Sequence, residues 1–170
     1  MSPPAGKPVV LPPHSLAVAL VRPQIPQNVG NVARTCVVTG AALHIAGPTP
    51  FAMDEARLRR SGLDYWPRLN LTIHASEADL LTCAPAGRAW LFDSAGEMSV
   101  FDADFEDGDW LIFGSETHGL PAGTLLRHAG RTVRIPQAAG ERCLNLATSA
   151  GVAIYQALGR IRRQGPVIAR

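Results

Sequence analysis

The chain has 170 residues, of which 46% are hydrophobic and 18% are charged, and its formal net charge at pH 7 is +2. These values are typical of one soluble globular domain that is long enough to bury a hydrophobic core. The small net charge does not by itself indicate a nucleic-acid-binding protein, and no apolar run reaches the roughly 20 residues that span a bilayer. We therefore expect one domain at residues 15–164, with a flexible proline-rich tail at 1–14 and a short tail at 165–170.

Short apolar runs alternate with helical patterns along the chain. In order, they predict a strand at residues 16–21, a helix at 28–39, a strand at 42–45, a helix at 54–61, a strand at 69–74, a helix at 76–82, strands at 88–92 and 110–113, a helix at 121–128, a strand at 132–135 and a helix at 145–163. This alternation is typical of an α/β fold with a mainly parallel sheet and helices on both faces.

Local signals mark the ends of several helices. Asn28 is placed to cap the first helix, and Gly40 to end it. Ser76 opens a Ser-x-x-Asp capping pattern. The last helix has apolar residues at three- and four-residue steps, namely Leu146, Ala150, Ala153, Ala157, Leu158 and Ile161. Its small alanines would allow close approach of a second copy of the chain, although packing on its own sheet is the plainer interpretation.

The three cysteines and the N-terminus bear on the cellular compartment. Cys36, Cys83 and Cys143 are odd in number and widely spaced, which argues against a disulfide framework and against a CxxC zinc site. The N-terminus is proline-rich and lacks the apolar core of a signal peptide. We therefore expect a reduced, cytoplasmic protein. Lys7 is the only lysine, and arginine suits phosphate through its planar fork, but codon bias in a GC-rich genome would give the same composition.

The most informative segments are two loops near the C-terminus. The first runs from the strand at 110–113 through residues 114–121, and the second leaves the strand at 132–135 and reaches residues 142–146. In each, an apolar run stops at glycine or proline and the chain then turns into a helical pattern. The carboxyl ends of strands are where α/β proteins usually bind ligands. The two loops therefore predict one site that is built mostly from backbone groups.

A third segment places Asn28, Asn31 and Arg34 near one helix start. The unpaired N–H groups of a helix N-terminus, with an arginine close by, suit an anion such as an RNA phosphate. Asn28 and Arg34 are six residues apart and so lie on different faces of an ideal helix, which means that they converge only if Asn28 is in the loop. The alternative is that Asn28 only caps the helix and that Arg34 is a solvated surface residue.

Other candidate residues have plain alternatives. Arg57, Arg59 and Arg60 crowd one turn of a predicted helix, which is either a solvated face or a patch that contacts phosphates. Glu116 either accepts hydrogen bonds from loop N–H groups or faces a ligand. Cys143 has no histidine nearby in the sequence, so we interpret it as a small buried residue rather than a nucleophile. We expect no metal, since no residue pairs with His118 at metal spacing, and we see no Walker loop and no GxGxxG.

Together the three segments resemble the three motifs of the SPOUT superfamily of S-adenosylmethionine-dependent RNA methyltransferases. Pro26-x-Asn28-x-Gly30-Asn31-x-x-Arg34 is similar to the first motif, Phe113-Gly114-Ser115-Glu116-x-x-Gly119-Leu120-Pro121 to the second, and Arg134-Ile135-Pro136 with Leu144-Asn145-Leu146 to the third. The stretch from Phe51 to Tyr65 resembles the small TrmL-type branch, the tRNA (cytidine/uridine-34) 2′-O-methyltransferases. The resemblance covers about residues 16–163.

This resemblance implies a deep C-terminal trefoil knot, a homodimer and no appended RNA-binding domain. It also implies that the knot loops hold S-adenosylmethionine, without a metal, at Phe92, Gly114, Ile135, Cys143 and Leu144. Backbone groups would recognise the adenine edge while apolar side chains enclose the ring. The chain departs from the family at Cys143 and Ala147, where serine is common. A thiol is a weaker hydrogen-bond partner than a hydroxyl, so these changes matter little only if the backbone makes the contact.

The implied reaction is methylation of the ribose 2′-oxygen at wobble nucleotide 34 of tRNA, a cytidine or a modified uridine, with leucine tRNAs as the expected substrates and S-adenosylhomocysteine as the product. The implied catalytic residues are Arg34, Glu116 and Asn145. A guanidinium is a poor base, so we expect Arg34 to stabilise the developing alkoxide or to clamp a phosphate, while Glu116 and Asn145 orient the site. The implied contacts to the tRNA anticodon stem-loop are Asn28, Arg57, Arg59 and Arg60.

The sequence leaves two alternatives for the function. One is 2′-O-methylation of another tRNA or rRNA position, against which the stretch from Phe51 to Tyr65 argues. The other is a non-catalytic RNA-binding or cofactor-sensing domain, against which the retention of Arg34 and of the donor-site loops argues. Calorimetry with S-adenosylhomocysteine separates the two classes, since an absence of binding would favour the RNA-binding module.

Overall fold

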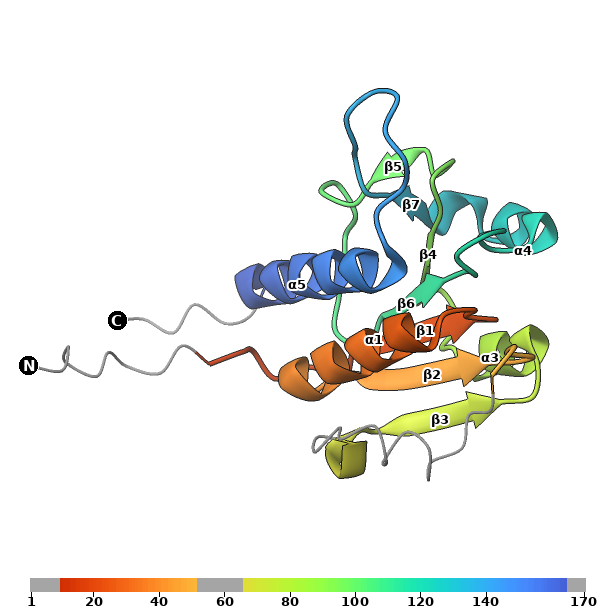
Figure 1. The fold of residues 1–170 in the computed structure, drawn as a ribbon. Helices are drawn as coiled ribbons and strands as arrows, with labels where there is room; N and C mark the ends of the chain where they lie inside the picture. The colour runs from red at the N-terminus through yellow and green to blue at the C-terminus, as the bar shows by residue number, and fades with distance from the viewer. Residues whose placement is uncertain (1–9, 52–65, 165–170) are drawn as a thin grey trace, which may run out of the picture.

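The computed structural model of the chain describes residues 10–51 and 66–164. Its centre is a seven-stranded sheet in the order β3-β2-β1-β6-β4-β7-β5, in which every pairing is parallel (Figure 1). The strands are β1 (Ala17–Val21), β2 (Ala42–Ala46), β3 (Leu71–His74), β4 (Ala89–Phe92), β5 (Met98–Ser99), β6 (Trp110–Phe113) and β7 (Thr132–Arg134). The helices are α1 (Pro26–Thr39), α3 (Glu77–Cys83), α4 (Ala122–Arg127) and α5 (Leu146–Gln164), with short 3-10 turns η1 (Trp66–Arg68) and η2 (Ala129–Arg131).

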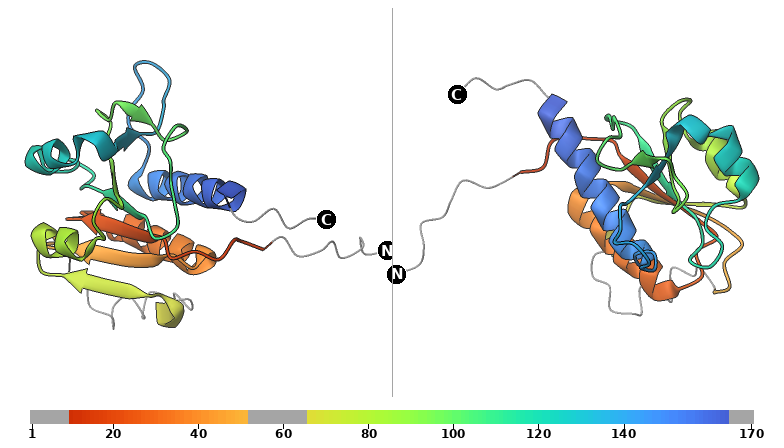
Figure 2. Two further views of the ribbon diagram at one scale, coloured as in Figure 1. Left: turned by 180° about the vertical axis from the view of Figure 1, so that it is seen from behind. Right: turned by 90° about the horizontal axis from the view of Figure 1, so that it is seen from above.

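Helices cover both faces of the sheet, as expected from the sequence. Helices α1 and α5 lie on one face, and α3 and α4 on the other (Figures 1 and 2). Strand β1 shows the consequence, because Val18 and Leu20 face the α1/α5 core while Ala17 and Ala19 face the α3/α4 core. A strand covered on both sides is apolar throughout rather than alternating. The alanines of α5 pack in its own core, so the plainer interpretation of that helix holds for them.

Two of the predicted helix ends are confirmed. Gly40 ends α1 with a φ of +84°, and its N–H donates to the carbonyl of Cys36. Ser76 caps α3 by accepting a hydrogen bond from the N–H of Asp79. The prediction of Asn28 as N-cap is wrong, because α1 begins two residues earlier, at Pro26, and Asn28 lies inside the helix. A proline near the first helical position needs no N–H partner there, which explains the earlier start.

Strand β5 was not predicted from the sequence. It has only two residues, Met98 and Ser99, which pair with Val133 and Arg134 of β7. So short a strand leaves no periodic signal, and its pairing partner is over thirty positions away in the chain.

The predicted helix at 54–61 lies outside the described residues, as does most of the two predicted tails. Within the described part, His14 bonds through its ring to the carbonyl of Thr39 at 2.8 Å.

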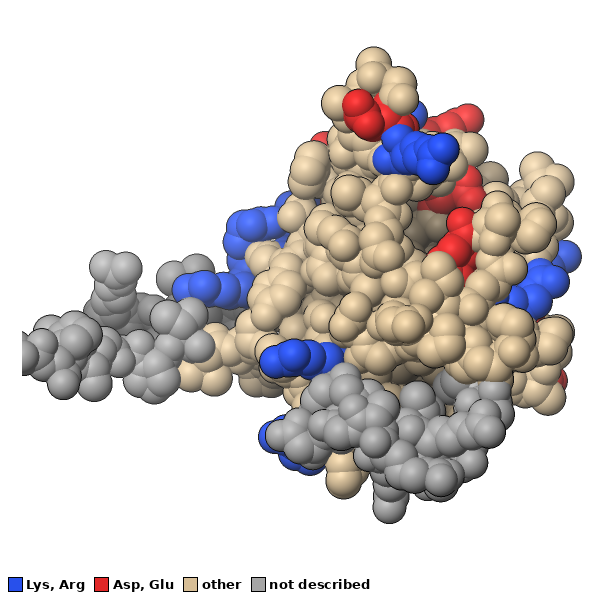
Figure 3. Space-filling view, viewed as in Figure 1, with Lys and Arg blue, Asp and Glu red and all other residues tan. Residues whose placement is uncertain are grey.

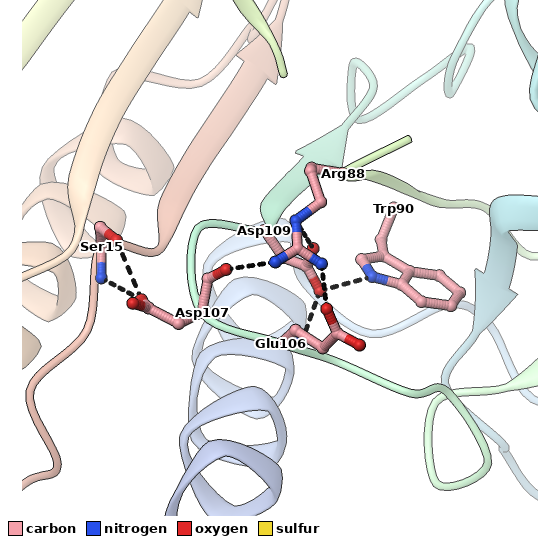
Figure 4. A network of polar contacts seen from close by, with 6 residues as sticks. All are labelled: Ser15, Arg88, Trp90, Glu106, Asp107 and Asp109. Carbon is pink, nitrogen blue, oxygen red and sulfur yellow. Dashed lines mark hydrogen bonds and ion pairs between the residues drawn. The ribbon is translucent and has the colours of Figure 1, made fainter. Parts of the chain in front are cut away.

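A polar network joins the amino ends of the central strands (Figure 4). The Asp107 carboxylate accepts from the N–H and hydroxyl of Ser15, just before β1, and these bonds lower its pKa. Arg88, just before β4, donates to the carbonyl of Asp107 at 2.7 Å and lies 3.5 Å from the Asp109 carboxylate. Asp109 is fully buried, which raises its pKa, and it accepts from the indole of Trp90 at 2.8 Å. The network fixes the sheet at the edge opposite the carboxyl ends.

Strand β7 lies between β4 and β5, so the C-terminal part of the chain returns into the sheet beside earlier segments. The loop after β4 crosses β7 closely, because a Cβ added at Gly96 would lie 2.6 Å from the carbonyl carbon of Val133. The N–H of Asp93 in the same loop donates to the carbonyl of Val133 at 3.0 Å. The threading of these segments through one another, which would make the knot, stays a prediction.

Candidate functional site

A cavity of about 550 Å³ opens at the carboxyl ends of β4, β6 and β7. Its walls are the loops that follow these strands, together with the first residues of α1 and α5. In the face shown in Figure 3, acidic side chains border a hollow below the loop of residues 136–145. The volume lies within the range of about 300–1,000 Å³ that is usual for ligand pockets. The two C-terminal loops therefore share one cavity, as the sequence led us to expect.

The residues predicted to hold the cofactor all line this cavity: Phe92, Gly114, Ile135, Cys143 and Leu144. Phe92 is buried and stacks on Phe113, with ring centroids 4.6 Å apart. Ile135 packs against the core, whereas Leu144 is 42% exposed. The lining thus offers aromatic and aliphatic surface that can enclose a flat heterocycle. The contacts of these residues with a cofactor stay a prediction.

Gly114 marks the closest approach of two backbone segments in the site. A Cβ added there would lie 2.0 Å from the carbonyl carbon of Gly119 and 2.2 Å from the nitrogen of Leu120. The loop is closed by two hydrogen bonds, since the N–H of Ser115 donates to Gly119 at 3.2 Å and the N–H of Gly119 donates back at 2.9 Å. Gly119 has a φ of +64°, a region that favours glycine. Only glycine at position 114 is compatible with this loop.

The Glu116 carboxylate holds the entry to α1. One of its oxygens accepts from the N–H of Gln24 at 2.7 Å, and the other from the N–H of Ile25 at 3.1 Å and the side-chain amide of Asn28 at 2.8 Å. A carboxylate is favourable at a helix N-terminus, where backbone N–H groups lack partners within the helix. Glu116 also lines the cavity. The structural interpretation of Glu116 is therefore confirmed, and its position leaves it within reach of a ligand.

Asn28 continues this hydrogen-bond chain to α5. Its side-chain oxygen accepts from the amide of Asn145 at 2.8 Å. The side-chain oxygen of Asn145 in turn accepts from the N–H groups of Ala147 at 2.9 Å and Thr148 at 3.3 Å, so Asn145 caps α5. The hydrogen-bond chain Glu116–Asn28–Asn145 thus ties together the three motif-like segments. Asn28 is 4% exposed and uses both amide atoms within the protein, and its contact with RNA stays a prediction.

Arg34 is not brought into this cavity. It lies on α1, is exposed, and is absent from the described residues that line the cavity. Because Asn28 lies inside the helix, the condition for convergence with Arg34 is not met, and the six-residue spacing directs the two side chains to different faces of α1. The predicted RNA contacts Arg57, Arg59 and Arg60 lie outside the described residues.

Cys143 is exposed at the cavity, so the expectation of a small buried residue is wrong. It lies in the loop between β7 and α5, where the chain leaves the sheet. Cys83 is also exposed, whereas Cys36 lies on the buried face of α1, and burial raises the pKa of its thiol to about 12. All three cysteines are free. The sequence itself argues against a disulfide framework.

Asp93 is not predicted from the sequence as a site residue, yet it lines the cavity, as Glu116 does. Its side chain accepts from the N–H of Ala95 at 2.9 Å and so shapes the loop after β4. The available signal was its position directly after an apolar run.

Over residues 10–51 and 66–164, no cluster of three or more histidine, cysteine, aspartate or glutamate side chains could hold a metal ion. No helix in the described part of the chain is long and apolar enough to cross a membrane.

Residues 15–155 match the model of the family described as "SpoU rRNA Methylase family". The tRNA (cytidine(34)-2'-O)-methyltransferase of Burkholderia ambifaria is 42% identical over 144 residues, which cover 82% of this chain and 92% of that protein. The protein of the same name from Escherichia coli strain K12 is 37% identical over 154 residues, which cover 90% of this chain and 98% of that protein.

Solved structures resemble the fold closely. One, described as "Structural insights into the 2-OH methylation of C/U34 on tRNA", has a TM-score of 0.80 at 44% identity and covers 86% of this chain and 96% of its own. The SpoU methyltransferase AviRb from Streptomyces viridochromogenes, in complex with the cofactor AdoMet, has a TM-score of 0.75 at 29% identity. That match covers 94% of this chain and 61% of AviRb.

Proposed function

Because the chain belongs to the SpoU rRNA Methylase family, we propose that it methylates the ribose 2′-oxygen of nucleotide 34 in tRNA, a cytidine or a modified uridine, with S-adenosylmethionine as the methyl donor. Leucine tRNAs are the proposed substrates. The observation that carries this proposal is the hydrogen-bond chain Glu116–Asn28–Asn145, which joins all three motif-like segments at one cavity. Relatives named for this reaction, similar along nearly their whole length, support it.

The residues at the cavity fit S-adenosylmethionine. Phe92, Ile135 and Leu144 offer apolar surface for the adenine ring, and the close approach at Gly114 brings backbone groups to the wall. A structure of the relative AviRb in complex with AdoMet supports this assignment. The polar residues Asp93 and Ser115 line the same cavity and can receive the ribose and amino acid parts of the donor. We propose no metal.

When bound, S-adenosylmethionine supplies an activated methyl group on a sulfonium, so the transfer needs no covalent enzyme intermediate. The protein must hold the ribose 2′-oxygen about 3 Å from that methyl group and assist the loss of the hydroxyl proton. Glu116 and Asn145 contribute by fixing the starts of α1 and α5 on either side of the cavity. Rigid support of this kind preorganises the site.

Arg34 acts on the RNA in this proposal. A guanidinium is a poor base, so Arg34 stabilises the developing alkoxide or clamps a phosphate. We expect Arg34→Ala to slow methylation by about 100-fold or more. The affinity for S-adenosylhomocysteine should stay unchanged, since Arg34 lies outside the cavity lining.

The proposed function is tested by mapping the methylated nucleotide in tRNA from a deletion strain before and after treatment with the purified protein. Methylation restored at nucleotide 34 supports the proposal, and methylation at another position supports the alternative methyltransferase. Calorimetry shows whether wild-type protein binds S-adenosylhomocysteine, and no binding favours the RNA-binding module. A wild-type rate for Arg34→Ala contradicts the role given to that residue.

We propose that Arg57, Arg59 and Arg60 hold the anticodon stem-loop. The support is their charge and their crowding in one short segment. Each lost phosphate contact should reduce the slope of log affinity against log salt by about 0.7–0.9. Glutamine at all three positions should therefore give a clearly shallower slope for tRNA binding. An unchanged slope would return these arginines to the status of surface residues.

We propose a homodimer that uses the outer face of α1 and α5. Val38 on α1 and Tyr155 on α5 are 63% and 53% exposed, and the two helices lie side by side (Figure 2). Large apolar side chains on an outer face are suited to a subunit interface.

We also propose the cytoplasm as the location, because free cysteines such as Cys83 and Cys143 stay reduced there.

A further inference from the structure

A second cavity, of about 350 Å³, adjoins the first at the carboxyl ends of β1, β2 and β6. Ser115, His118 and Gly119 line both cavities, so the loop after β6 separates them. Arg22 and Pro48 line only the second cavity. An RNA whose ribose meets a methyl donor in the first cavity must place the neighbouring phosphate and base within a few ångströms of that ribose. The second cavity is the adjoining space of suitable size.

Arg22 is held at this cavity by its backbone and by an ion pair. Its φ of +50° is uncommon for a residue with a side chain, and its N–H donates to the carbonyl of Ala46 at 2.8 Å. Its Nη2 atom lies 3.2 Å from a carboxylate oxygen of Glu77 in α3. The other oxygen of Glu77 accepts from the hydroxyl of Thr124, which is buried in α4. The position of the Arg22 guanidinium is therefore set by the end of β1, by Glu77 in α3 and by Thr124 in α4.

The ion pair with Glu77 does not use all the hydrogen-bond donors of the Arg22 side chain. A guanidinium has five N–H donors, the ion pair uses Nη2, and the Arg22 side chain is 46% exposed. The ion pair orients the side chain, although a half-exposed pair contributes little free energy. The other N–H donors can then bind a ligand. The planar fork of arginine matches a phosphate in particular. The rings of Pro48, Pro50 and His118 stand around the same cavity and offer surface to a nucleobase.

We propose, resting on the proposed function, that the second cavity is the subsite for the nucleotide adjacent to the methylated ribose and that Arg22 binds its phosphate. Gln24 supports the wall between the cavities, because its side-chain oxygen accepts from the N–H of Thr117 at 3.2 Å. Arg22 is thus a substrate-binding residue that acts on RNA and has no part in holding the methyl donor. It lines only the second cavity, which gives this division of roles its physical basis.

The test compares Arg22→Gln with Arg160→Gln. Arg160 is a matched control, since its side chain is 42% exposed, is ion-paired with Asp104, and lies outside the described linings of both cavities. We expect Arg22→Gln to raise the KM for tRNA about tenfold and to reduce the salt slope of tRNA binding by about 1, measured from about 50 to about 200 mM salt. The kcat and the affinity for S-adenosylhomocysteine should stay within about twofold of wild type. Arg160→Gln should change none of these quantities.

The proposal is overturned if Arg22→Gln has the KM and salt slope of Arg160→Gln. It is also overturned if Arg22→Gln loses affinity for S-adenosylhomocysteine, because that result assigns Arg22 to the carboxylate of the methyl donor. Failure of the proposed function looks different, since the wild-type protein would then leave nucleotide 34 of tRNA unmethylated. In that case the salt slopes of the two variants still decide whether Arg22 contacts an RNA phosphate.

Discussion

Cys143 provides a chemical probe of the candidate cofactor cavity. It is exposed and lines the cavity, Cys83 is exposed on α3, and Cys36 is buried with its thiol pKa raised to about 12. Because the thiolate is the reactive form, we expect iodoacetamide at pH 8 to label Cys83 and Cys143 but not Cys36 in the folded protein. Saturating S-adenosylhomocysteine should slow labelling of Cys143 several-fold and leave Cys83 unchanged, as measured by mass spectrometry of the peptides. Equal protection of both cysteines, or of neither, would contradict the position given to the cofactor.

His44 forms a pair with His74, and the titration of His44 bears on stability. Nδ1 of His44 lies 2.9 Å from Nε2 of His74, and the His44 ring lies against Trp110 with centroids 4.0 Å apart. Burial, and then the neighbouring His74, lowers the pKa of His44 from its usual 6.5 to about 4. As the pH falls from about 6.5 to about 4, the unfolded chain takes up a proton at His44 that the folded chain does not. The free energy of unfolding should therefore decrease across this window.

We expect this decrease to be about 1–2 kcal/mol, after allowing for solvent screening of a half-buried group. The measurement is urea unfolding at several pH values for wild type and His44→Gln. The difference between the two proteins should shrink as the pH falls through the window, because the variant cannot be protonated there. His128→Gln, at the end of α4 and outside the pair, serves as the control. A constant difference from pH 7 to pH 4 would show that His44 does not titrate as described.

At the scale of elements, the loop between β6 and α4 depends on Gly114. A Cβ at this position would lie 2.0 Å from the backbone of Gly119, and backbone cannot move aside as a flexible side chain can. We expect Gly114→Ala to lower the free energy of unfolding by about 2–4 kcal/mol and to abolish S-adenosylhomocysteine binding in the protein that remains folded. Thermal unfolding and calorimetry measure the two effects.

Gly123→Ala is the matched control for that loop. Gly123 lies in α4, only nine residues further on, and a Cβ there would meet nothing closer than 3.8 Å. Because alanine is the better helix former, this change should leave stability equal or slightly higher. If Gly114→Ala were as stable as Gly123→Ala and bound S-adenosylhomocysteine normally, the close approach at Gly114 would be needed neither for stability nor for binding.

The elements with strong local signals were predictable from the sequence, and those set by distant contacts were not. The buried strands and the long helix α5 carry apolar patterns in their own local sequence, and the family resemblance is confirmed. Strand β5 exists because β7 pairs with it, and the exposure of Cys143 follows from how the loop projects. The second cavity arises where the chain beyond β1 and β2 meets the loop of β6, which no local pattern records.

At the scale of the whole molecule, strand order explains why the two cavities lie side by side. Strand β6 is placed between β1 and β4, so the loop that follows it stands between the chain entering α1 and the loops after β4 and β7. Parallel strands bring all these loops to one edge. The loop of Ser115 to Gly119 therefore forms a wall of both cavities, and a methyl donor and an RNA can meet across it.

The position of Arg34 bears on which subunit's site it serves. Arg34 is exposed on α1, outside the cavity lining, and lies one helical turn from Val38 on the same side of the helix. If that face is the subunit interface of a homodimer, Arg34 of one subunit is directed toward its partner. We therefore expect Arg34 to complete the site of the other subunit, so that a subunit lacking Arg34 can still be served by an intact one.

Mixed dimers decide this point. Arg34→Ala keeps an intact cavity, while Cys143→Trp fills the cavity with an indole but keeps Arg34, and each variant alone should be inactive. After the two are unfolded and refolded together, half of the dimers are mixed and each has one complete site, so activity should recover to about a quarter of wild type. Tyr155→Asp on both chains should abolish this recovery and halve the sedimenting mass to that of one 18.1 kDa chain, because a charge on the α5 face prevents association. No recovery in mixtures that do form dimers would mean that Arg34 serves its own subunit.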